Sequence, residues 1–328
     1  MQVSPSVRAV QVPDDDPMHP QFTTIYLVGR GQTLSIDSGE AVERYRWMLR
    51  GYLAAQERAE ISLAAVTHHH ADHCGNLRWA REVFGAEVLV PPNARTLFRG
   101  RLPKDGVRAL RDGDVIELDG GVRVQVLETP GHSRDSLCFY LEAEGVLFTG
   151  DTLLGSTTTT VSDLAAYRRT LERLLRLPNL RVICPGHGPL VFDPRERIQM
   201  YIAHRNERER QILEFLAAAR RPVTSWEITK ALYPDIHPRL RRAADNNVRA
   251  HLRQLELEGR LDVLPGVPRE RDPEREAEER RRAREREALI RRARQLEAAE
   301  RRRRIRAQES PPREQWRRPP RFRLRSAT

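Results

Sequence analysis

The chain has 328 residues, of which 39% are hydrophobic, and its formal net charge at pH 7 is +11. It contains no run of about 18 apolar residues, which excludes a helical membrane span, and its first residues lack the charged and then apolar pattern of a signal peptide. Three cysteines without a CxxC spacing fit a reducing compartment better than a disulfide framework. We therefore expect a soluble, cytoplasmic protein with one large domain or two unequal ones.

The excess positive charge lies at the carboxyl end of the chain. Residues 266–328 contain 22 arginines and 12 acidic residues, so they carry most of the net charge of +11. Glutamates four residues ahead of arginines, such as Glu278 and Arg282, predict a partly helical, exposed tail, and its prolines predict a disordered basic end. Two roles remain open for this tail: electrostatic capture of RNA, DNA or another acidic surface, and a solvated low-complexity segment.

The first part of the chain alternates short apolar runs with helical patterns. Residues 1–20 are polar and punctuated by prolines, and we expect them to lie over the surface as an extension. Two strands joined by a glycine-containing turn predict a hairpin, and a helix with apolar residues at helical spacing follows it. The predicted elements are strands over 21–28 and 32–36, a helix over 40–59, a strand over 61–66, a helix over 76–84, a strand over 87–90 and a short helix over 93–99.

The middle of the chain is rich in strands, and several of them end at residues that can do chemistry. The predicted elements are strands over 114–118, 122–128, 136–141 and 146–149, a helix over 164–175 and a strand over 182–184. Strands interleaved with helices predict an α/β body, in which the loops at strand ends supply the functional site.

One stretch carries the strongest chemical signal: Thr67-His68-His69-His70-Ala71-Asp72-His73, directly after the strand predicted over 61–66. Neutral imidazole and carboxylate are good ligands for zinc. These side chains can converge within so few residues only if something offsets their crowding, and a cation does so. The stretch therefore predicts a metal site in the loop at the carboxyl end of a buried strand.

Three later residues also follow short apolar strands: His132 in Pro-Gly-His, Asp151 in Gly-Asp and His187 in Gly-His-Gly. Taken alone, each has an ordinary explanation as a turn, cap or loop residue. Taken together, and at the same kind of strand end as the first stretch, they favour one shared site. Four neighbouring glycines would let the backbone approach a metal or adopt positive φ, namely Gly131, Gly150, Gly186 and Gly188.

These motifs, in this order, resemble those of the metallo-β-lactamase superfamily over about residues 20–200. The resemblance implies an α/β fold of four layers (αββα), with two β-sheets packed between outer helices. It also implies a dinuclear zinc site, although manganese and iron accept the same ligands. By this resemblance, His68, His70 and His132 hold the first ion, Asp72, His73 and His187 hold the second, and Asp151 bridges both, while His69 occupies a variable position.

The same resemblance implies a hydrolase. Two cations about 3.5 to 4 Å apart can share one water, lower its pKa toward neutrality and hold a bridging hydroxide for attack. Asp151 would act in catalysis by offsetting the repulsion between the ions and fixing their spacing, and Asp72 by orienting the nucleophile. Thiolate is also a strong zinc ligand, but the expected ligand positions are filled, so we predict that Cys74 is a buried thiol. Cys138 and Cys184 fall in predicted strands and should be core thiols.

A second unit follows the site. Helices are predicted over 198–219 and 240–258, a capping box at Thr224-Ser225-Trp226-Glu227 opens a short helix to 232, and 260–264 looks like a strand. This is a winged-helix order, which suits either a nucleic-acid reader or a helical cap over the active-site face. The predicted domains are an extension over 1–20, a catalytic domain over 21–197, a winged-helix-like domain over 198–265 and the tail over 266–328.

The joining of these two units resembles the β-lactamase-like-protein-2 group, whose characterised members are endoribonucleases selective for single strands. One departure is Thr23-Thr24-Ile25-Tyr26, where the group usually has Thr-Asn-Thr-Tyr. The resemblance implies a phosphodiesterase that acts on single-stranded RNA or another anionic substrate. Two other functions remain open: hydrolysis of a thioester or other acyl compound, as in glyoxalase II, and non-catalytic binding of nucleic acid.

Overall fold

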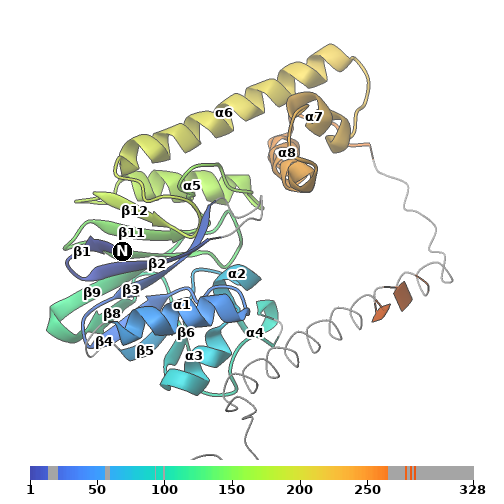
Figure 1. The fold of residues 1–328 in the computed structure, drawn as a ribbon. Coiled ribbons are helices and arrows are strands. Elements are labelled where there is room, and N and C mark those ends of the chain that lie inside the picture. Colours follow the sequence, from blue (N-terminus) through green and yellow to red (C-terminus); the bar gives the residue numbers. More distant parts are fainter. Residues whose placement is uncertain are drawn as a thin grey trace, which may run out of the picture. The chain divides into compact units, whose positions relative to one another are not determined.

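Two mixed β-sheets lie face to face in the computed structural model, which describes residues 1–13, 21–55, 60–92, 94–98, 100–264, 278, 281, 282, 284 and 285 (Figure 1). Within these residues the first sheet has the spatial order β1 (Gln2–Ser4), β2 (Val7–Pro13), β3 (Phe22–Val28), β4 (Gln32–Ile36), β5 (Glu60–Ala65), β6 (Glu87–Val90) and β7 (Val107–Ala109). The second has the order β12 (Val182–Pro185), β11 (Val146–Gly150), β10 (Leu137–Leu141), β9 (Val122–Glu128) and β8 (Val115–Leu118).

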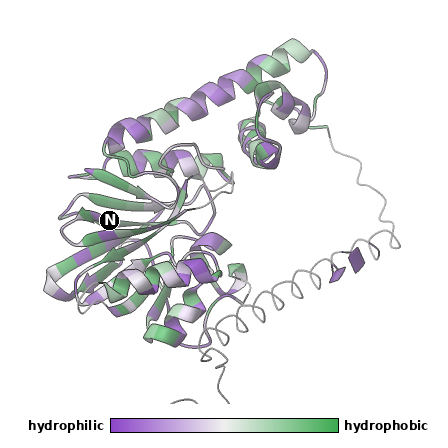
Figure 2. Ribbon diagram, viewed as in Figure 1, coloured by the Kyte–Doolittle hydropathy of each residue, from purple (hydrophilic) through white to green (hydrophobic). Residues whose placement is uncertain are grey.

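Apolar residues on both faces of each sheet create the layers. One core cluster lies between the sheets and includes Tyr26 and Phe148, whose rings meet edge to face at 5.2 Å. A second cluster joins the other face of the first sheet to α1 (Glu43–Ala54) and α3 (Leu77–Phe84). A third joins the second sheet to α5 (Leu164–Leu175) and α6 (Pro194–Ala219), and Figure 2 shows mainly hydrophobic strands between mixed helices. The predicted four-layer αββα fold is confirmed.

Strand direction brings the chemically important loops to one end of the sandwich. In the first sheet β4 and β5 are parallel, so the loops after them leave the same edge. In the second sheet β9 and β11 are both antiparallel to β10, and β12 is parallel to β11. The loops after β9, β11 and β12 therefore leave one edge as well. Backbone bonds join the two edges, from Leu137 N to Thr67 O at 2.8 Å and from Thr24 N to Gly186 O at 2.9 Å.

The amino-terminal residues do not lie over the surface as the sequence suggested. Residues 7–13 form β2, which pairs with β3 along its whole length, and Val7, Ala9, Val10 and Val12 are buried. The expectation of a surface extension over residues 1–20 is therefore wrong for this part. Residues 7–12 lack a strict alternation of apolar residues and are flanked by prolines. Their strand depends on pairing with β3, a partner that local sequence does not reveal. Residues 14–20 lie outside the described part.

The helical module has its own small core, built on Ile212, Ile228, Val248 and Leu255. It contains α7 (Ser225–Leu232), the short 3-10 helix η2 (Pro238–Leu240) and α8 (Arg241–Leu257). Three other short helices lie in the sandwich: α2 (Ala71–Cys74), α4 (Ala94–Leu97) and η1 (Asp119–Gly121). The capping box at the start of α7 is confirmed. The strand expected over 260–264 is wrong, since these residues pair with no described strand and Leu261 instead packs against the module core.

The 26-residue helix α6 belongs to two cores. Its first half places Ile198 and Tyr201 against the second sheet, and its second half places Ile212 in the core of the helical module. Residues 1–264 accordingly form one compact unit.

Most of the basic tail lies outside the described residues, and so do most of its predicted charge pairs. One pair within them, Glu278 with Arg282, is an ion pair at 2.7 Å. Among the described helices, none is both long enough and apolar enough to cross a membrane. The cytoplasmic location stays a prediction.

Candidate metal centre

All seven residues that the sequence singled out as ligands meet at the end of the sandwich where the two sheet edges join. They form two groups, in each of which the potential ligand atoms lie within 4.8 Å of one another. The first group is His68, His70, His132 and Asp151, and the second is Asp72, His73 and His187. The histidines and Asp72 fall into the two groups that the resemblance implied. That these residues bind metal stays a prediction. His69 turns away, and its Nδ1 lies 2.8 Å from Asp135 Oδ1.

Asp151 lies between the two groups. Its Oδ1 is 3.2 Å from His73 Nε2 and 3.4 Å from His187 Nε2, whereas its Oδ2 is 3.8 Å from His132 Nε2. Oδ1 is buried and has no hydrogen-bond partner among the described residues. A buried carboxylate oxygen without a donor is costly, and a cation would remove that cost. Asp151 is therefore a suitable ligand for a cation in either group.

Hydrogen bonds on the outer side of the first group fix which ring nitrogen carries the proton. His132 Nδ1 lies 2.9 Å from the carbonyl oxygen of Thr160, which can only accept, so Nδ1 donates and Nε2 keeps its lone pair. His68 Nδ1 lies 3.0 Å from Thr67 Oγ1. That hydroxyl donates its one hydrogen to the Asp37 carboxylate, so it accepts a hydrogen bond from His68 Nδ1. Both rings consequently present an unprotonated Nε2 to the centre, as a metal ligand requires.

Three ring nitrogens of the first group face one another at distances that a single shared proton cannot satisfy. His70 Nδ1 is 2.8 Å from His68 Nε2 and 3.2 Å from His132 Nε2. One proton on His70 could satisfy only one of these contacts, whereas a single cation would satisfy all three nitrogens. The residues therefore fit a divalent metal ion, both in donor type and in arrangement.

The second group has the same design. His73 Nδ1 lies 2.7 Å from Asp37 Oδ2, and His187 Nδ1 lies 3.1 Å from Thr23 Oγ1, so each Nε2 faces inward. On the inner side, His187 Nε2 is 3.0 Å from Asp72 Oδ2. A carboxylate behind a ligating histidine, as Asp37 is behind His73, orients the ring and raises its basicity.

Electrostatics distinguish the two groups. Burial lowers the pKa of His70 to about 4 and also lowers the pKa values of His68 and His132, so these rings are neutral at neutral pH. Burial also acts to lower the pKa of His73, but the carboxylates beside it outweigh that effect and raise its pKa well above the ordinary value.

The carboxylates respond in the opposite sense. Burial acts to raise the pKa values of Asp72 and Asp151, but the neighbouring imidazoles outweigh it and hold both pKa values well below the ordinary range. Both carboxylates are therefore ionised at neutral pH. Neutral imidazoles in one group and ionised carboxylates shared with the other make a suitable donor set for two dications.

Glycines allow the close approach that the sequence predicted. A Cβ added at Gly186 would lie 2.5 Å from His73 Cε1 and 3.0 Å from Asp151 Oδ1. Gly150 has φ +48°, and its added Cβ would lie 2.4 Å from Thr67 Oγ1. Any side chain at either position would displace a ligand or its support.

Sequence reasoning missed the residues that hold the ligands from behind. Asp37 is buried, follows β4 with φ +64°, and accepts the backbone N–H of Thr67 at 2.7 Å in addition to its contact with His73. The one available signal was a polar residue directly after the strand predicted over 32–36. Thr159 also supports a ligand, because its Oγ1 lies 2.9 Å from His132 Nδ1.

Residues 157–161, which we call the threonine segment, are also bonded to helices α6 and α8. Arg205 on α6, which is buried, donates to Thr159 O at 2.7 Å, and Tyr201 donates to Thr157 O at 2.7 Å. From α8, Asn247 Oδ1 accepts the backbone N–H of Val161 at 2.8 Å. The segment that positions His132 is thereby fastened from two helices.

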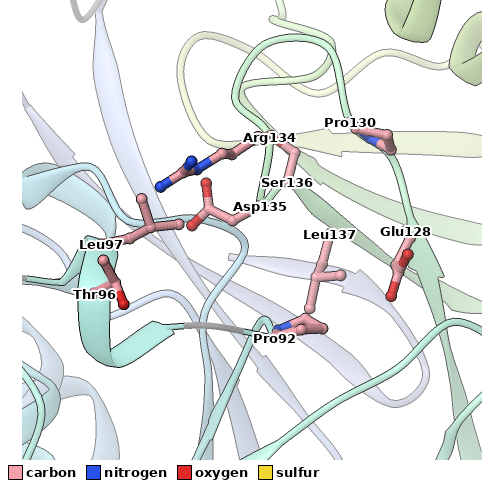
Figure 3. Close-up of a pocket in the computed structure, with 9 residues that line it drawn as sticks. All are labelled: Pro92, Thr96, Leu97, Glu128, Pro130, Arg134, Asp135, Ser136 and Leu137. Carbon is pink, nitrogen blue, oxygen red and sulfur yellow. The ribbon is translucent and has the colours of Figure 1, made fainter.

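A cavity of about 230 Å³ opens over the ligands. Asp72 and Asp151 lie on one side, and the threonine segment and helical module form the others, including Thr157, His204, Tyr233 and Asn247. A different hollow of about 460 Å³ (Figure 3) is lined by Pro92, Thr96, Leu97, Glu128, Pro130, Arg134, Asp135, Ser136 and Leu137. The lining of this hollow includes none of the seven ligand candidates.

The three cysteines should be unreactive while the protein is folded. All three are buried, and burial raises the pKa of Cys138 to about 11, that of Cys74 to about 12 and that of Cys184 further. Cys74 Sγ donates to His69 O at 3.2 Å and belongs to neither ligand group, as predicted. Ellman's reagent should label no thiol in native buffer and three in denaturing guanidinium chloride. Rapid labelling of Cys74 in the native, metal-loaded protein would contradict its burial.

Comparison with known families agrees with this geometry. Residues 19–187 match the metallo-beta-lactamase superfamily, and residues 224–264 match the beta-lactamase associated winged helix domain. The chain belongs to the metallo-beta-lactamase superfamily. Members of this superfamily are usually hydrolases and bind divalent metals in a dinuclear site. The resemblance inferred from the motifs, including the winged-helix appendage, is confirmed.

Individual relatives of this superfamily member extend the comparison. It is 34% identical over 265 residues to the beta-lactamase-like protein 2 homolog of Drosophila melanogaster, a match that covers 76% of this chain and 87% of that protein. It is 37% identical over 212 residues to the atrochrysone carboxyl ACP thioesterase of Aspergillus fumigatus, covering 63% and 64%. A metallo-beta-lactamase family protein from Thermus thermophilus shares the fold with a TM-score of 0.67 at 28% identity, covering 80% and 97%.

Proposed function

We propose that this protein is a dinuclear, zinc-dependent phosphodiesterase that cleaves single-stranded RNA. The observation that carries the proposal is the position of Asp151, whose carboxylate lies between the two candidate ligand groups beside a cavity. When bound there, two divalent cations would lower the pKa of a water shared between them and neutralise charge on the reacting phosphate.

The chain's own residues supply orientation. Asp72 is ionised, borders the cavity and has Oδ2 on the inner side of the second group, so it can accept a hydrogen bond from the attacking water. Hydrolysis forms one P–O bond from that water and breaks another, and the water's proton ends on the leaving alcohol. His204 reaches the cavity as a neutral ring, since burial, with help from Arg205 and Arg208, lowers its pKa to about 4. It can donate a hydrogen bond to the leaving oxygen.

The charge around the site favours an anionic substrate. A groove that shares His70 and His132 with the site is also lined by Arg239, Arg242, Arg249 and Arg253. A phosphodiester backbone has the complementary charge, whereas a neutral acyl compound gains little from four guanidinium groups.

A second candidate function is hydrolysis of a thioester. It is favoured by one observation, the 37% identity to the Aspergillus fumigatus thioesterase over 212 residues. The same ligand groups serve either reaction, because stabilising charge on a carbonyl oxygen needs the same ions.

A mixed substrate panel tests the proposal. Purified full-length protein, with its metal content measured, is incubated with single-stranded RNA, double-stranded RNA, a thioester and a lactone. We expect about two zinc ions per chain, cleavage of single-stranded RNA, loss of activity on chelation and recovery on adding zinc. Thioester hydrolysis without RNA cleavage would establish the second candidate instead. Well under one metal ion per chain, together with tight RNA binding and no hydrolysis, would indicate a non-catalytic binding protein.

A further inference from the structure

One face of α8 carries a row of three arginines and one asparagine. Arg242, Asn246, Arg249 and Arg253 are spaced four, three and four residues apart, which places them along one side of a helix. Together with Arg239 they line a groove of about 580 Å³. At 1.5 Å per residue the row from the first to the last arginine is about 16 Å long.

The groove leads to the metal centre. Its lining includes His70 and His132 of the first ligand group, together with Thr160 and Ser162 of the segment that holds them. Its fixed position relative to the ligands comes from Asn247, which bonds the backbone of Val161 at 2.8 Å. A chain lying along the groove would therefore enter the centre from a defined side.

Two arginines of the row, Arg242 and Arg253, differ from exposed arginines such as Arg210 in their ion pairing with the residues that the structure describes. On α6 the exposed Arg210 pairs with Glu207 at 2.6 Å and also with Glu214, the usual arrangement for a solvated helix face. On α8, Arg249 has a partner in Asp245 at 2.8 Å. Arg242 and Arg253 are exposed and have no carboxylate partner among the residues that the structure describes. Among the described residues that line the groove, none is acidic.

We propose that this arginine groove holds the sugar-phosphate backbone of single-stranded RNA on one side of the scissile phosphate. The inference rests on the proposed function and adds the path of the substrate. Guanidinium groups in a row bind successive phosphates without reading bases, so recognition along the groove is independent of sequence. Only a flexible single strand can both follow the row and bend into the cavity of about 230 Å³ beside it.

Equilibrium binding tests the groove without relying on catalysis. Full-length protein with its metal bound is titrated with a fluorescent 2′-O-methyl oligonucleotide at several salt concentrations, and the oligonucleotide is checked for cleavage after each titration. The double variant Arg242→Gln/Arg253→Gln is compared with Arg241→Gln/Arg176→Gln, which removes the same charge from exposed positions outside the groove. The basic tail is present in every protein and contributes equally to each.

Each phosphate contact on a single strand contributes about 0.7 to the slope of log affinity against log salt, so losing two contacts should reduce that slope by about 1.4. We expect this reduction, and roughly tenfold weaker binding at low salt, in the groove variant alone. Equal slopes in the groove and control variants would overturn the inference.

A small substrate separates failure of the groove from failure of the proposed function. The groove variant should lose about tenfold in kcat/KM on RNA, whereas the control variant Arg241→Gln/Arg176→Gln should keep the wild-type value. On bis(p-nitrophenyl) phosphate, which has one phosphate and no backbone to lie along the groove, the groove variant should lose much less than on RNA. RNA cleavage that is unchanged in the groove variant refutes the groove and leaves the proposed function standing. Wild-type protein that hydrolyses neither phosphodiester refutes the proposed function, and the binding slopes still decide the groove.

Discussion

Replacing Asp151 by asparagine should lower kcat/KM for RNA by about 10³-fold or more, because several kcal/mol of metal-dependent stabilisation is lost. The carboxylate faces His73 and His187 with one oxygen and His132 with the other. An amide keeps the volume but removes the negative charge that offsets repulsion between two dications. Metal analysis should therefore show about one ion per chain instead of two.

Asp135→Asn is the matched control. Asp135 is also a buried aspartate at this end of the sandwich, but its carboxylate contacts His69 and Ser133 and belongs to neither ligand group. The control should keep its metal and remain within about tenfold of the wild-type kcat/KM. An Asp151→Asn protein that retains two ions and comparable activity would show that the carboxylate does not join the metals.

Replacing Asp37 by asparagine should weaken metal binding by about 10- to 100-fold, the usual effect of losing a partner behind a ligating histidine. Asp37 accepts the backbone N–H of Thr67 and the Nδ1–H of His73 with its two oxygens. An asparagine can accept with only one atom, so one contact is lost in either orientation of the amide. If the amide nitrogen faces His73, the ring must protonate Nε2 and can no longer bind a metal through it.

Competition with a chelator measures this effect, and excess zinc provides the decisive control. Since asparagine tolerates the φ of +64° at this position, Asp37→Asn should remain folded and regain activity when zinc is raised. Asp37→Ala should additionally lose roughly 1 to 3 kcal/mol of unfolding free energy, because the buried Thr67 N–H is left without an acceptor. Unchanged zinc affinity in Asp37→Asn would show that Asp37 does not orient His73.

The candidate ligands could be predicted because each lies in a short motif that is recognisable from neighbouring residues alone. The His-rich stretch, Pro-Gly-His, Gly-Asp and Gly-His-Gly each lie within a few residues of a strand end, and alternating apolar runs predicted those strands. The order of the motifs then allowed a family resemblance to supply the grouping around Asp151, and the structure places the residues in those two groups.

The features that escaped prediction depend on distant partners. The strand β2 exists because β3 offers it a full register of hydrogen bonds, and residues 260–264 are not a strand because no described strand pairs with them. Asp37 is important only because β4 lies beside β5. The arginines of α8 become a groove only because that helix docks beside His132. None of these neighbours is encoded within a short window of sequence.

The double fastening of the threonine segment couples two processes that would otherwise be separate. Thr159 and Thr160 hold His132, while Asn247 and Arg205 attach the same segment to the helical module. Metal occupancy and docking of the module therefore share a free energy of interaction, which must act equally in both directions. If docking of the module raises metal affinity by some factor, bound metal must favour the docked state of the module by the same factor. A substitution that loosens the winged-helix appendage should then weaken metal binding, even though the appendage supplies none of the candidate ligands.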